Sequence, residues 1–216
     1  MSFPKSFLFI GNSATHVNNL PATFASLCDV TSKMATKDGY FLKHLAEDEE
    51  VCEEIKKGYD VVFFQDNGGV ILSDEERKLC KEACEKMTNT AKKAGSDCWF
   101  YVRPPYGHNM VDYTNLDQSI LLDEHFTKLS KELDMNCAYV NRAFSYAIKN
   151  YDIPLYGPDN AHTSIYGAYL AVCVFYTAIF KRSATELEIA YGLSKEDAEV
   201  LQKIADKISL EGFIPW

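Results

Sequence analysis

The sequence predicts an α/β fold, a three-layer sandwich of helices around a five-stranded parallel sheet. Two observations lead to this prediction: short, almost continuously apolar runs, and amphipathic helical patterns that alternate with them. Such alternation is typical of βαβ units. Strands that lack polar alternation are typical of a parallel sheet that helices cover on both faces.

Five short runs have the composition expected of buried strands. They are residues 6–10, 30–34, 61–65, 98–102 and 137–140. In open parallel sheets the functional crevice lies beyond the carboxyl ends of the strands. We therefore expect polar residues directly after these runs to carry the chemistry.

Five longer segments have helical patterns. They are residues 20–28, 73–94, 117–133, 166–180 and 195–210. Pro21 suits a first helical turn, and Ser73 with Glu76 forms a capping-box pattern. No repeat, low-complexity tract or long linker interrupts the chain, so we predict a single domain over residues 1–216.

Composition excludes some classes of partner. Hydrophobic residues make up 47% and charged residues 25%, as in ordinary globular proteins, and the formal net charge is -9. This charge disfavours nucleic acids and anionic membrane surfaces. The uncharged run 163–180 contains Ser164, Gly167 and three tyrosines, so we predict a buried helix and no membrane partner.

Seven cysteines are scattered without CxxC or Cys/His spacing, so we expect no metal and no cofactor. Their pattern fits a reducing compartment. The apolar run 7–10 is too short for the core of a secretory signal. We therefore expect a cytoplasmic protein.

The stretch FLFIGNSATH places a glycine, an amide and a hydroxyl at the end of the first predicted strand. Gly11 permits a tight turn there, and Ser13 can project its hydroxyl into the crevice. A second interpretation is that Ser13 merely caps a helix.

A serine nucleophile needs an adjacent base, usually histidine. The candidates are His16, His44, His108, His125 and His162. His162 has the most suitable context, because Asp159 stands three residues before it in the polar turn YGPDNAH. A carboxylate at that spacing can hold the imidazole in the tautomer a general base requires. The alternative is that Asp159 and His162 cap the following helix.

Together, these motifs resemble the SGNH, or GDSL-type, hydrolase superfamily. IGNS near the N-terminus, D-x-x-H before a helix near the C-terminus, and HTSIYGAYL carry the resemblance, closest to the branch that has GNS in its first block. It implies a flavodoxin-like fold and an esterase, lipase or carbohydrate deacetylase. By position, Ser13 would be the nucleophile, His162 the general base and then acid, and Asp159 its orienting partner.

The resemblance also implies an oxyanion hole made by the Ser13 backbone N–H, a glycine N–H and an asparagine side chain. Gly39, between a predicted strand and a helix, is the candidate glycine; the alternative is that it is a plain turn glycine. In VVFFQDNGG, Asn67 matches the asparagine, although the family's leading glycine and trailing aspartate are absent. Gln65 is the alternative source of the amide.

Candidate substrate contacts are Gln65, Arg103 and Tyr106, with His108 nearby in the loop after the fourth predicted strand. Arg103 suits a carboxylate or a sugar hydroxyl, or it pairs structurally with Asp66 or another acidic residue. No long apolar lid is evident. A short acyl ester of a polar alcohol, such as an acetylated sugar, is therefore the predicted substrate, and analogy with the family contributes to that choice.

Two other functions are compatible with the sequence. One is a non-catalytic, flavodoxin-like binding module, although the first loop has no G-x-G-x-x-G or P-loop pattern. The other is a degenerate hydrolase that serves as an interaction domain, which the irregular QDNGG block would allow.

Overall fold

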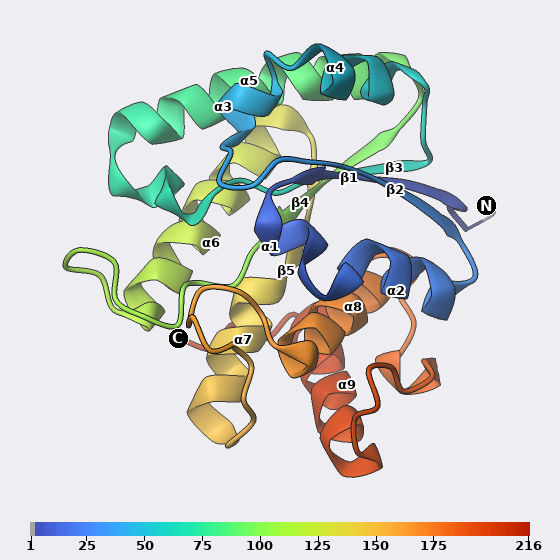
Figure 1. Ribbon diagram of the computed structural model, residues 1–216, viewed down its shortest axis with the longest axis vertical. Helices are drawn as coiled ribbons and strands as arrows, with labels where there is room; N and C mark the ends of the chain where they lie inside the picture. The colour runs from blue at the N-terminus through green and yellow to red at the C-terminus, as the bar shows by residue number, and fades with distance from the viewer. Residues whose placement is uncertain (1–2) are drawn as a thin grey trace.

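The computed structural model describes residues 3–216 and has a five-stranded sheet at its centre (Figure 1). All neighbouring strands are parallel, in the order β2-β1-β3-β4-β5. This is the flavodoxin-like order, so the predicted fold class is confirmed. The strands are β1 (Ser6–Gly11), β2 (Thr31–Thr36), β3 (Val61–Phe64), β4 (Asp97–Val102) and β5 (Asn136–Tyr139).

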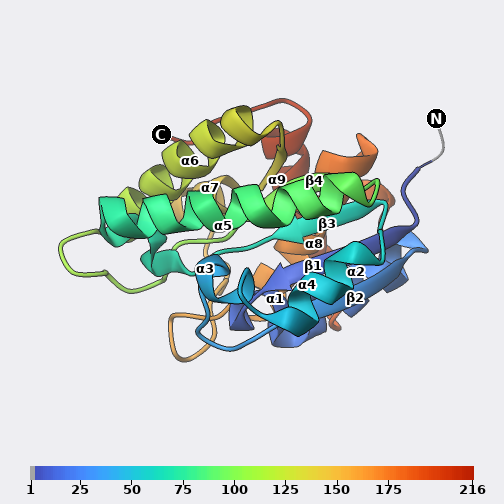
Figure 2. The ribbon, with the colours of Figure 1, turned by 90° about the horizontal axis from the view of Figure 1, so that it is seen from above.

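Helices cover both faces of the sheet, as Figure 2 shows from above. One layer contains α3 (Leu42–Leu45), α4 (Glu49–Lys56), α5 (Asp74–Lys93) and α6 (Asn115–Leu133). The other contains α2 (Leu20–Cys28), α7 (Val140–Asn150), α8 (Ile165–Phe180) and α9 (Lys195–Ser209). The short α1 (Ser13–His16) follows β1 directly, and short 3₁₀ segments lie at η1 (Val17–Asn19), η2 (Gly68–Leu72) and η3 (Ala184–Glu186).

The alternation of side chains along β1 divides the core into two halves. Phe7 and Phe9 face the layer of α8, whereas Leu8 and Ile10 face the layer of α5, and all four are fully buried. Phe9 stacks on Phe63 with ring centroids 4.9 Å apart. Because both faces exclude water, each position of the strand is apolar, which is why the run has no alternation.

Two helices of eight or more residues, α4 and α7, were not predicted. In α4 only Val51 and Ile55 are buried, which is too few for a recognisable stripe. The buried face of α7 includes the polar residues Arg142 and Ser145, which break the apolar pattern. The chain enters α7 at Val140, a residue predicted to end the fifth strand.

The apolar run at 163–180 forms α8, which packs between the sheet and α9 and is buried on most sides. Its cap is Ser164, whose Oγ accepts from the N–H groups of Tyr166 and Gly167. Over residues 3–216, none of the helices has both the length and the apolar character needed to cross a membrane.

Candidate active site

The carboxyl end of β1 carries Ser13 into the crevice where the strand order reverses, between β1 and β3. Asn12 is the N-cap of α1, and its Oδ1 accepts from the Ala14 N–H. Ser13 is the first residue of α1, so its own N–H has no acceptor within that helix. Asn12 therefore supports the turn, and Ser13 is the residue that it presents.

Three side chains from distant parts of the chain form one hydrogen-bonded line. His162 Nε2 lies 2.8 Å from Ser13 Oγ, and His162 Nδ1 lies 2.6 Å from Asp159 Oδ2. With the Nδ1 proton on the carboxylate side, Nε2 is left as an acceptor for the serine proton. The three residues predicted to be catalytic are thus brought together in hydrogen-bonding order.

Asp159 is held in a tight loop before α8. Its Oδ1 accepts from the N–H groups of Ala161 and His162, each at 3.0 Å. The hydrogen bond from His162, followed by these backbone bonds, holds the pKa of the Asp159 carboxyl well below its usual range. Because Ser164 caps α8, the alternative that Asp159 and His162 serve as its caps does not describe this turn.

Gly11 is required here because a side chain would overlap its neighbours. The prediction that it permits a tight turn is corrected. It ends β1 in extended conformation, with no positive φ. A Cβ at this position would lie 2.5 Å from Gln65 Oε1 and closer still to Thr15 Oγ1. Glycine lets the Gln65 side chain cross behind the serine turn.

Gln65 is 1% exposed and is hydrogen-bonded inside the protein. Its Oε1 accepts from the Asn12 N–H at 3.0 Å and from Thr15 Oγ1 at 2.8 Å, while its Nε2 donates to the carbonyl of Asp66. These bonds fix the serine turn and use one of the two Nε2 hydrogens. Because the side chain is buried and holds the serine turn, the suggestions that Gln65 contacts substrate or supplies the oxyanion-hole amide are corrected: it supports the nucleophile loop.

Gly39 and Asn67, the other predicted oxyanion donors, lie side by side. Asn67 Nδ2 donates to the Gly39 carbonyl at 3.2 Å, and Asn67 Oδ1 accepts from the Gly69 N–H at 2.9 Å. Gly39 has a φ of +71°, a conformation that favours glycine. Asn12 Nδ2 donates to the Tyr40 carbonyl at 2.9 Å, which ties this loop to the serine turn.

Asp66 joins the same two loops, and the sequence interpretation gave it no such role. Its Oδ1 accepts from the N–H of Leu42 at 2.8 Å and from the N–H of Asn67 at 2.7 Å. The side chain is 1% exposed, and burial raises its pKa. One feature of the sequence could have indicated this role: Asp66 follows β3 closely and directly precedes Asn67, the candidate oxyanion donor.

Arg103 and Tyr106 come from the loop between β4 and α6. The guanidinium carbon lies 4.0 Å from the centre of the Tyr106 ring, and Tyr106 OH is 3.4 Å from Asn67 Oδ1. His108 stacks on Tyr106 and contacts the Asn160 carbonyl through Nδ1 at 3.2 Å. This loop therefore borders both the asparagine and the turn that carries His162.

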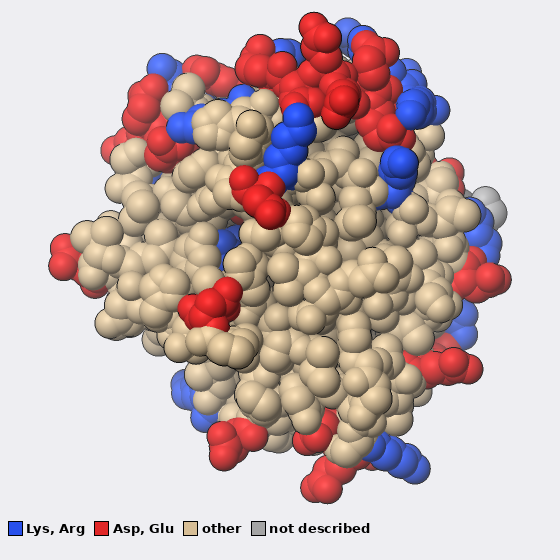
Figure 3. Space-filling model, viewed as in Figure 1, with Lys and Arg blue, Asp and Glu red and all other residues tan. Residues whose placement is uncertain are grey.

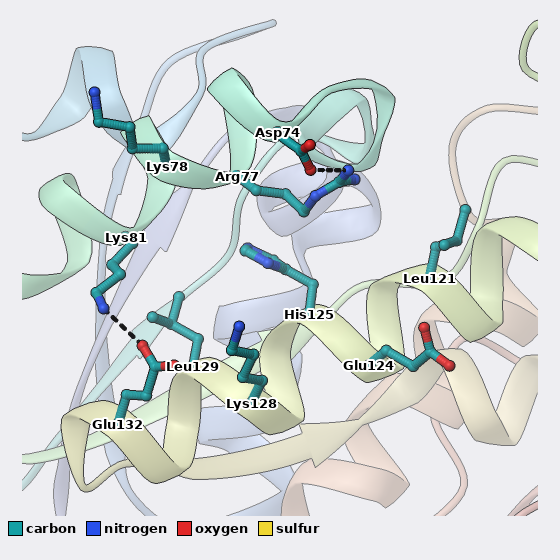
Figure 4. Close-up of a pocket in the computed structure, with 10 residues that line it drawn as sticks. All are labelled: Asp74, Arg77, Lys78, Lys81, Leu121, Glu124, His125, Lys128, Leu129 and Glu132. Carbon is teal, nitrogen blue, oxygen red and sulfur yellow. Dashed lines mark hydrogen bonds and ion pairs between the residues drawn. The ribbon is translucent and has the colours of Figure 1, made fainter.

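The other histidines lie outside the hydrogen-bonded line. His16 contacts Asp38 and Thr36, and His44 accepts from the Phe41 N–H. His125 borders a separate cavity of about 530 Å³ between α5 and α6, where Figure 4 shows its ring among charged side chains. Burial lowers the pKa of His125 to about 4. In residues 3–216 no three His, Cys, Asp or Glu side chains cluster as metal ligands would.

Much of the face that carries α1 is uncharged. Figure 3 shows acidic and basic side chains gathered mainly over α4 and α5, with a largely tan surface at the centre of the view. An open hollow of about 660 Å³ adjoins the crevice, lined by Asp38, Gly39, Tyr40, Lys43, His44, Glu47 and Asp48. The crevice edge thus offers aromatic and polar contacts.

Solved structures resemble this architecture over four fifths of the chain or more. A DUF4886 family protein from Bacteroides uniformis has a TM-score of 0.80 at 13% identity, over 96% of this chain and 95% of that one. A candidate SGNH hydrolase from Slackia heliotrinireducens has a TM-score of 0.69 at 21% identity, over 80% of this chain and 97% of that one. The chain has the SGNH hydrolase fold.

Axe2, an acetylxylan esterase from Geobacillus stearothermophilus, shares this SGNH fold with a TM-score of 0.61 at 13% identity, over 81% of this chain and 94% of that one. No family model matches the sequence, and no curated protein does. At these identities the likeness concerns the fold, so the chemistry has to be argued from the side chains of the site.

Proposed function

We propose that this protein is a serine ester hydrolase in which Ser13, His162 and Asp159 form the catalytic triad. The observation that carries the proposal is the continuous line from Asp159 Oδ2 through the imidazole to Ser13 Oγ, with contacts of 2.6 and 2.8 Å. Support also comes from the fold, which is shared with SGNH hydrolases and an acetylxylan esterase.

In the first half of the reaction, Ser13 Oγ attacks the ester carbonyl carbon while His162 Nε2 accepts the hydroxyl proton. The carbonyl oxygen becomes negative and meets the N–H groups of Ser13 and Gly39 and the side chain of Asn67. One Asn67 N–H is used by the Gly39 carbonyl, which leaves the second for the oxyanion. The ester C–O bond then breaks, and His162 gives its proton to the departing alcohol.

The second half removes the acyl group from Ser13. A water molecule gives one proton to His162 Nε2 and attacks the acyl carbon. The bond to Ser13 Oγ breaks, and the serine recovers its proton from the imidazole. Asp159 accepts the hydrogen bond from Nδ1 in both halves and stabilises each imidazolium.

We place the substrate among short-chain esters of polar alcohols, such as acetylated carbohydrates. The aromatic and polar residues at the crevice edge, among them Tyr40 and Tyr106, suit a sugar ring, whose apolar faces stack on aromatic rings and whose hydroxyls need partners. The acetylxylan esterase with this fold supports the same class.

The test is hydrolysis of p-nitrophenyl acetate with pre-steady-state resolution. We expect a burst of p-nitrophenol from acylation, and covalent labelling of Ser13 by an organophosphonate. Ser13→Ala is expected to abolish both, whereas Ser209→Ala, at the last residue of α9, is the matched serine control.

Substrates of different acyl length and a variant of the oxyanion hole test the substrate class and the mechanism. We expect the acetyl ester to be hydrolysed faster than the octanoyl ester, and Asn67→Ala to lower kcat by about 10²–10³-fold. Full activity in a folded Ser13→Ala protein would overturn the mechanism. A wild type that is inert on all short acyl esters would favour the non-catalytic or degenerate alternatives.

A further inference from the structure

Arg103 is the one arginine whose charge no carboxylate balances within residues 3–216. The chain has four arginines, and the other three are paired: Arg77 with Asp74, Arg142 with Asp123, and Arg182 with Glu186. No Asp or Glu oxygen in this part of the chain lies within 4.0 Å of the Arg103 guanidinium. Yet Arg103 is only 2% exposed.

The comparison with Arg142 shows what a buried arginine in this protein otherwise has. Arg142 Nε and Nη2 donate to the two carboxylate oxygens of Asp123 at 2.5 and 2.9 Å. Arg103 Nε instead donates to the Pro104 carbonyl at 2.9 Å, and Nη2 lies 3.5 Å from the Ala161 carbonyl. Neutral carbonyls and one aromatic ring compensate a buried charge only partly.

The unbalanced guanidinium lies between the two halves of the candidate active site. Its Nη2 contact, Ala161, directly precedes His162. On the other side, Nη1 approaches Gly68, the residue after Asn67, so closely that a Cβ there would lie 2.8 Å from it. Nη1 has no hydrogen-bond acceptor in the part of the chain described, so its donors remain for a ligand.

We propose that Arg103 binds a carboxylate carried by the ester substrate. This rests on the proposed function, which it narrows from short-chain esters to esters that bear a carboxylate close to the scissile bond. A carboxylate matches the planar fork of a guanidinium and supplies the missing opposite charge. The suggestion that Arg103 pairs with Asp66 is wrong, since Asp66 Oδ1 accepts from Leu42 and Asn67 and no ion pair joins the two.

The charges around the site indicate that an anionic substrate would be bound by a local contact with Arg103 and not by a general electrostatic attraction. The whole chain has a formal net charge of -9, so the long-range field repels an anionic substrate. The face around α1 is mostly uncharged in Figure 3, which leaves the short-range contact with Arg103 to decide binding. The preference should therefore depend on this one side chain.

The experiment compares charged esters with their neutral isosteres. For a carboxylate on the acyl side, the pair is p-nitrophenyl hemisuccinate and its methyl ester. For a carboxylate on the alcohol side, the pair is 4-acetoxybenzoate and its methyl ester. In at least one pair we expect wild-type kcat/KM to favour the charged ester by about tenfold or more, and the responding pair identifies which side carries the group.

Three variants then test whether Arg103 causes the preference for the charged ester. Arg103→Met should bring the charged-to-neutral ratio to one or below, and Arg103→Lys should keep part of the preference because it retains the charge without the fork. Lys92→Met, on α5, removes a cation that is paired with Asp134 and should leave the ratio unchanged. The absence of a preference in both pairs of the wild type, or its persistence in Arg103→Met, would overturn the assignment.

A binding measurement keeps this result separate from the proposed function. Two pairs are titrated into the Ser13→Ala protein and followed by ligand-observed NMR: monomethyl succinate with neutral dimethyl succinate, and 4-acetoxybenzoate with its methyl ester. Tighter binding of the anion in either pair, lost when Arg103→Met is added, supports the carboxylate site even if no ester is hydrolysed. Equal binding within both pairs would contradict it, whatever the activity. If Arg103→Met does not fold, the same comparison is made with Arg103→Lys.

Discussion

The imidazole Nε2 of His162 lies 2.8 Å from Ser13 Oγ, although 149 residues separate the two in the chain. The contact exists because the β1–α1 turn and the loop before α8 meet at the same end of the sheet. Asn18 strengthens this meeting, since its Nδ2 donates to the Thr163 carbonyl at 2.6 Å. The relationship between Ser13 and His162 leads to the first prediction.

Ser13 and His162 should act as a unit. We expect Ser13→Ala and His162→Ala each to lower kcat by roughly 10⁴-fold or more, and the double variant to be no worse than either single one. Steady-state turnover of p-nitrophenyl acetate is the measurement. His16→Ala, which removes a nearby imidazole that contacts Asp38, is the control. Additive losses in the double variant would show that the two side chains do not share one proton transfer.

Asp159→Asn should lower kcat by roughly 10²–10⁴-fold, because the amide does not hold the imidazole in the productive tautomer or stabilise its charged form. Asp38→Asn is the matched control, since Asp38 also contacts a histidine, His16, at 3.2 Å. Turnover that is equal in Asp159→Asn and wild type would remove Asp159 from the mechanism.

The low pKa of Asp159 also gives a pH dependence. The carboxylate stays charged at pH values where an ordinary aspartate, with a pKa near 3.9, takes up a proton. Its contribution to stability is therefore fully present above the ordinary value and is lost only as pH falls through the lowered folded-state pKa. The measurement is chemical denaturation of wild type and Asp159→Asn from pH 3 to 7. The free energy of unfolding of the wild type should exceed that of the variant, and this excess should persist as pH falls to the ordinary aspartate pKa.

Asp66 should position the oxyanion donors. Asp66→Ala leaves the N–H groups of Leu42 and Asn67 without their acceptor, at a cost of about 1–3 kcal/mol in stability for each group that stays unsatisfied. We expect kcat to fall in the folded variant while Asp66→Asn, which keeps an acceptor oxygen, retains more activity. Equal kcat in wild type and Asp66→Ala would contradict the role.

The raised pKa of Asp66 predicts the opposite pH trend from Asp159. Because the folded protein holds this proton more tightly than the unfolded chain, the stability contribution of Asp66 falls as pH rises from the ordinary aspartate value through the raised one. Denaturation curves measured over that range should show the decline in wild type and its absence in Asp66→Asn.

Gly11→Ala should damage the serine turn by steric overlap. The new methyl group would displace Gln65 and Thr15, whose mutual hydrogen bond is 2.8 Å long. We expect a loss of about 1–3 kcal/mol in stability and a fall in kcat. Gly157→Ala is the control in the opposing loop, because its added Cβ would make only ordinary contacts, at 3.6 Å and beyond. A Gly11→Ala protein as active as wild type would contradict the steric argument.

Val111 should be replaceable with a gain in stability. It is 79% exposed and has a φ of +51°, a conformation that a β-branched residue adopts only with strain. We expect Val111→Gly to raise the free energy of unfolding by about 0.5–1 kcal/mol, because relief of that strain exceeds the entropic cost of glycine. Val200→Gly, inside α9, should instead destabilise. Thermal denaturation of the three proteins decides between these outcomes.

The sequence by itself determined the five parallel strands and most long helices, because residues buried on both faces of a sheet have to be apolar without interruption. It also pointed to Ser13, Asp159 and His162, which stand in short local motifs that a chain displays directly. The helices α4 and α7 were not predicted, because the buried face of α4 contains too few apolar residues and that of α7 contains polar ones.

Only the tertiary structure decided which polar side chains have hydrogen-bond or ion-pair partners within the protein. Gln65 and Arg103 were both candidates for substrate contact, yet Gln65 uses its amide within the protein, whereas Arg103 is buried without an opposite charge. The role of Asp66 became visible in the same way, through two backbone N–H groups from separate loops. Hydrogen bonds between distant segments depend on distances that arise only when the chain is folded, so no local pattern records them.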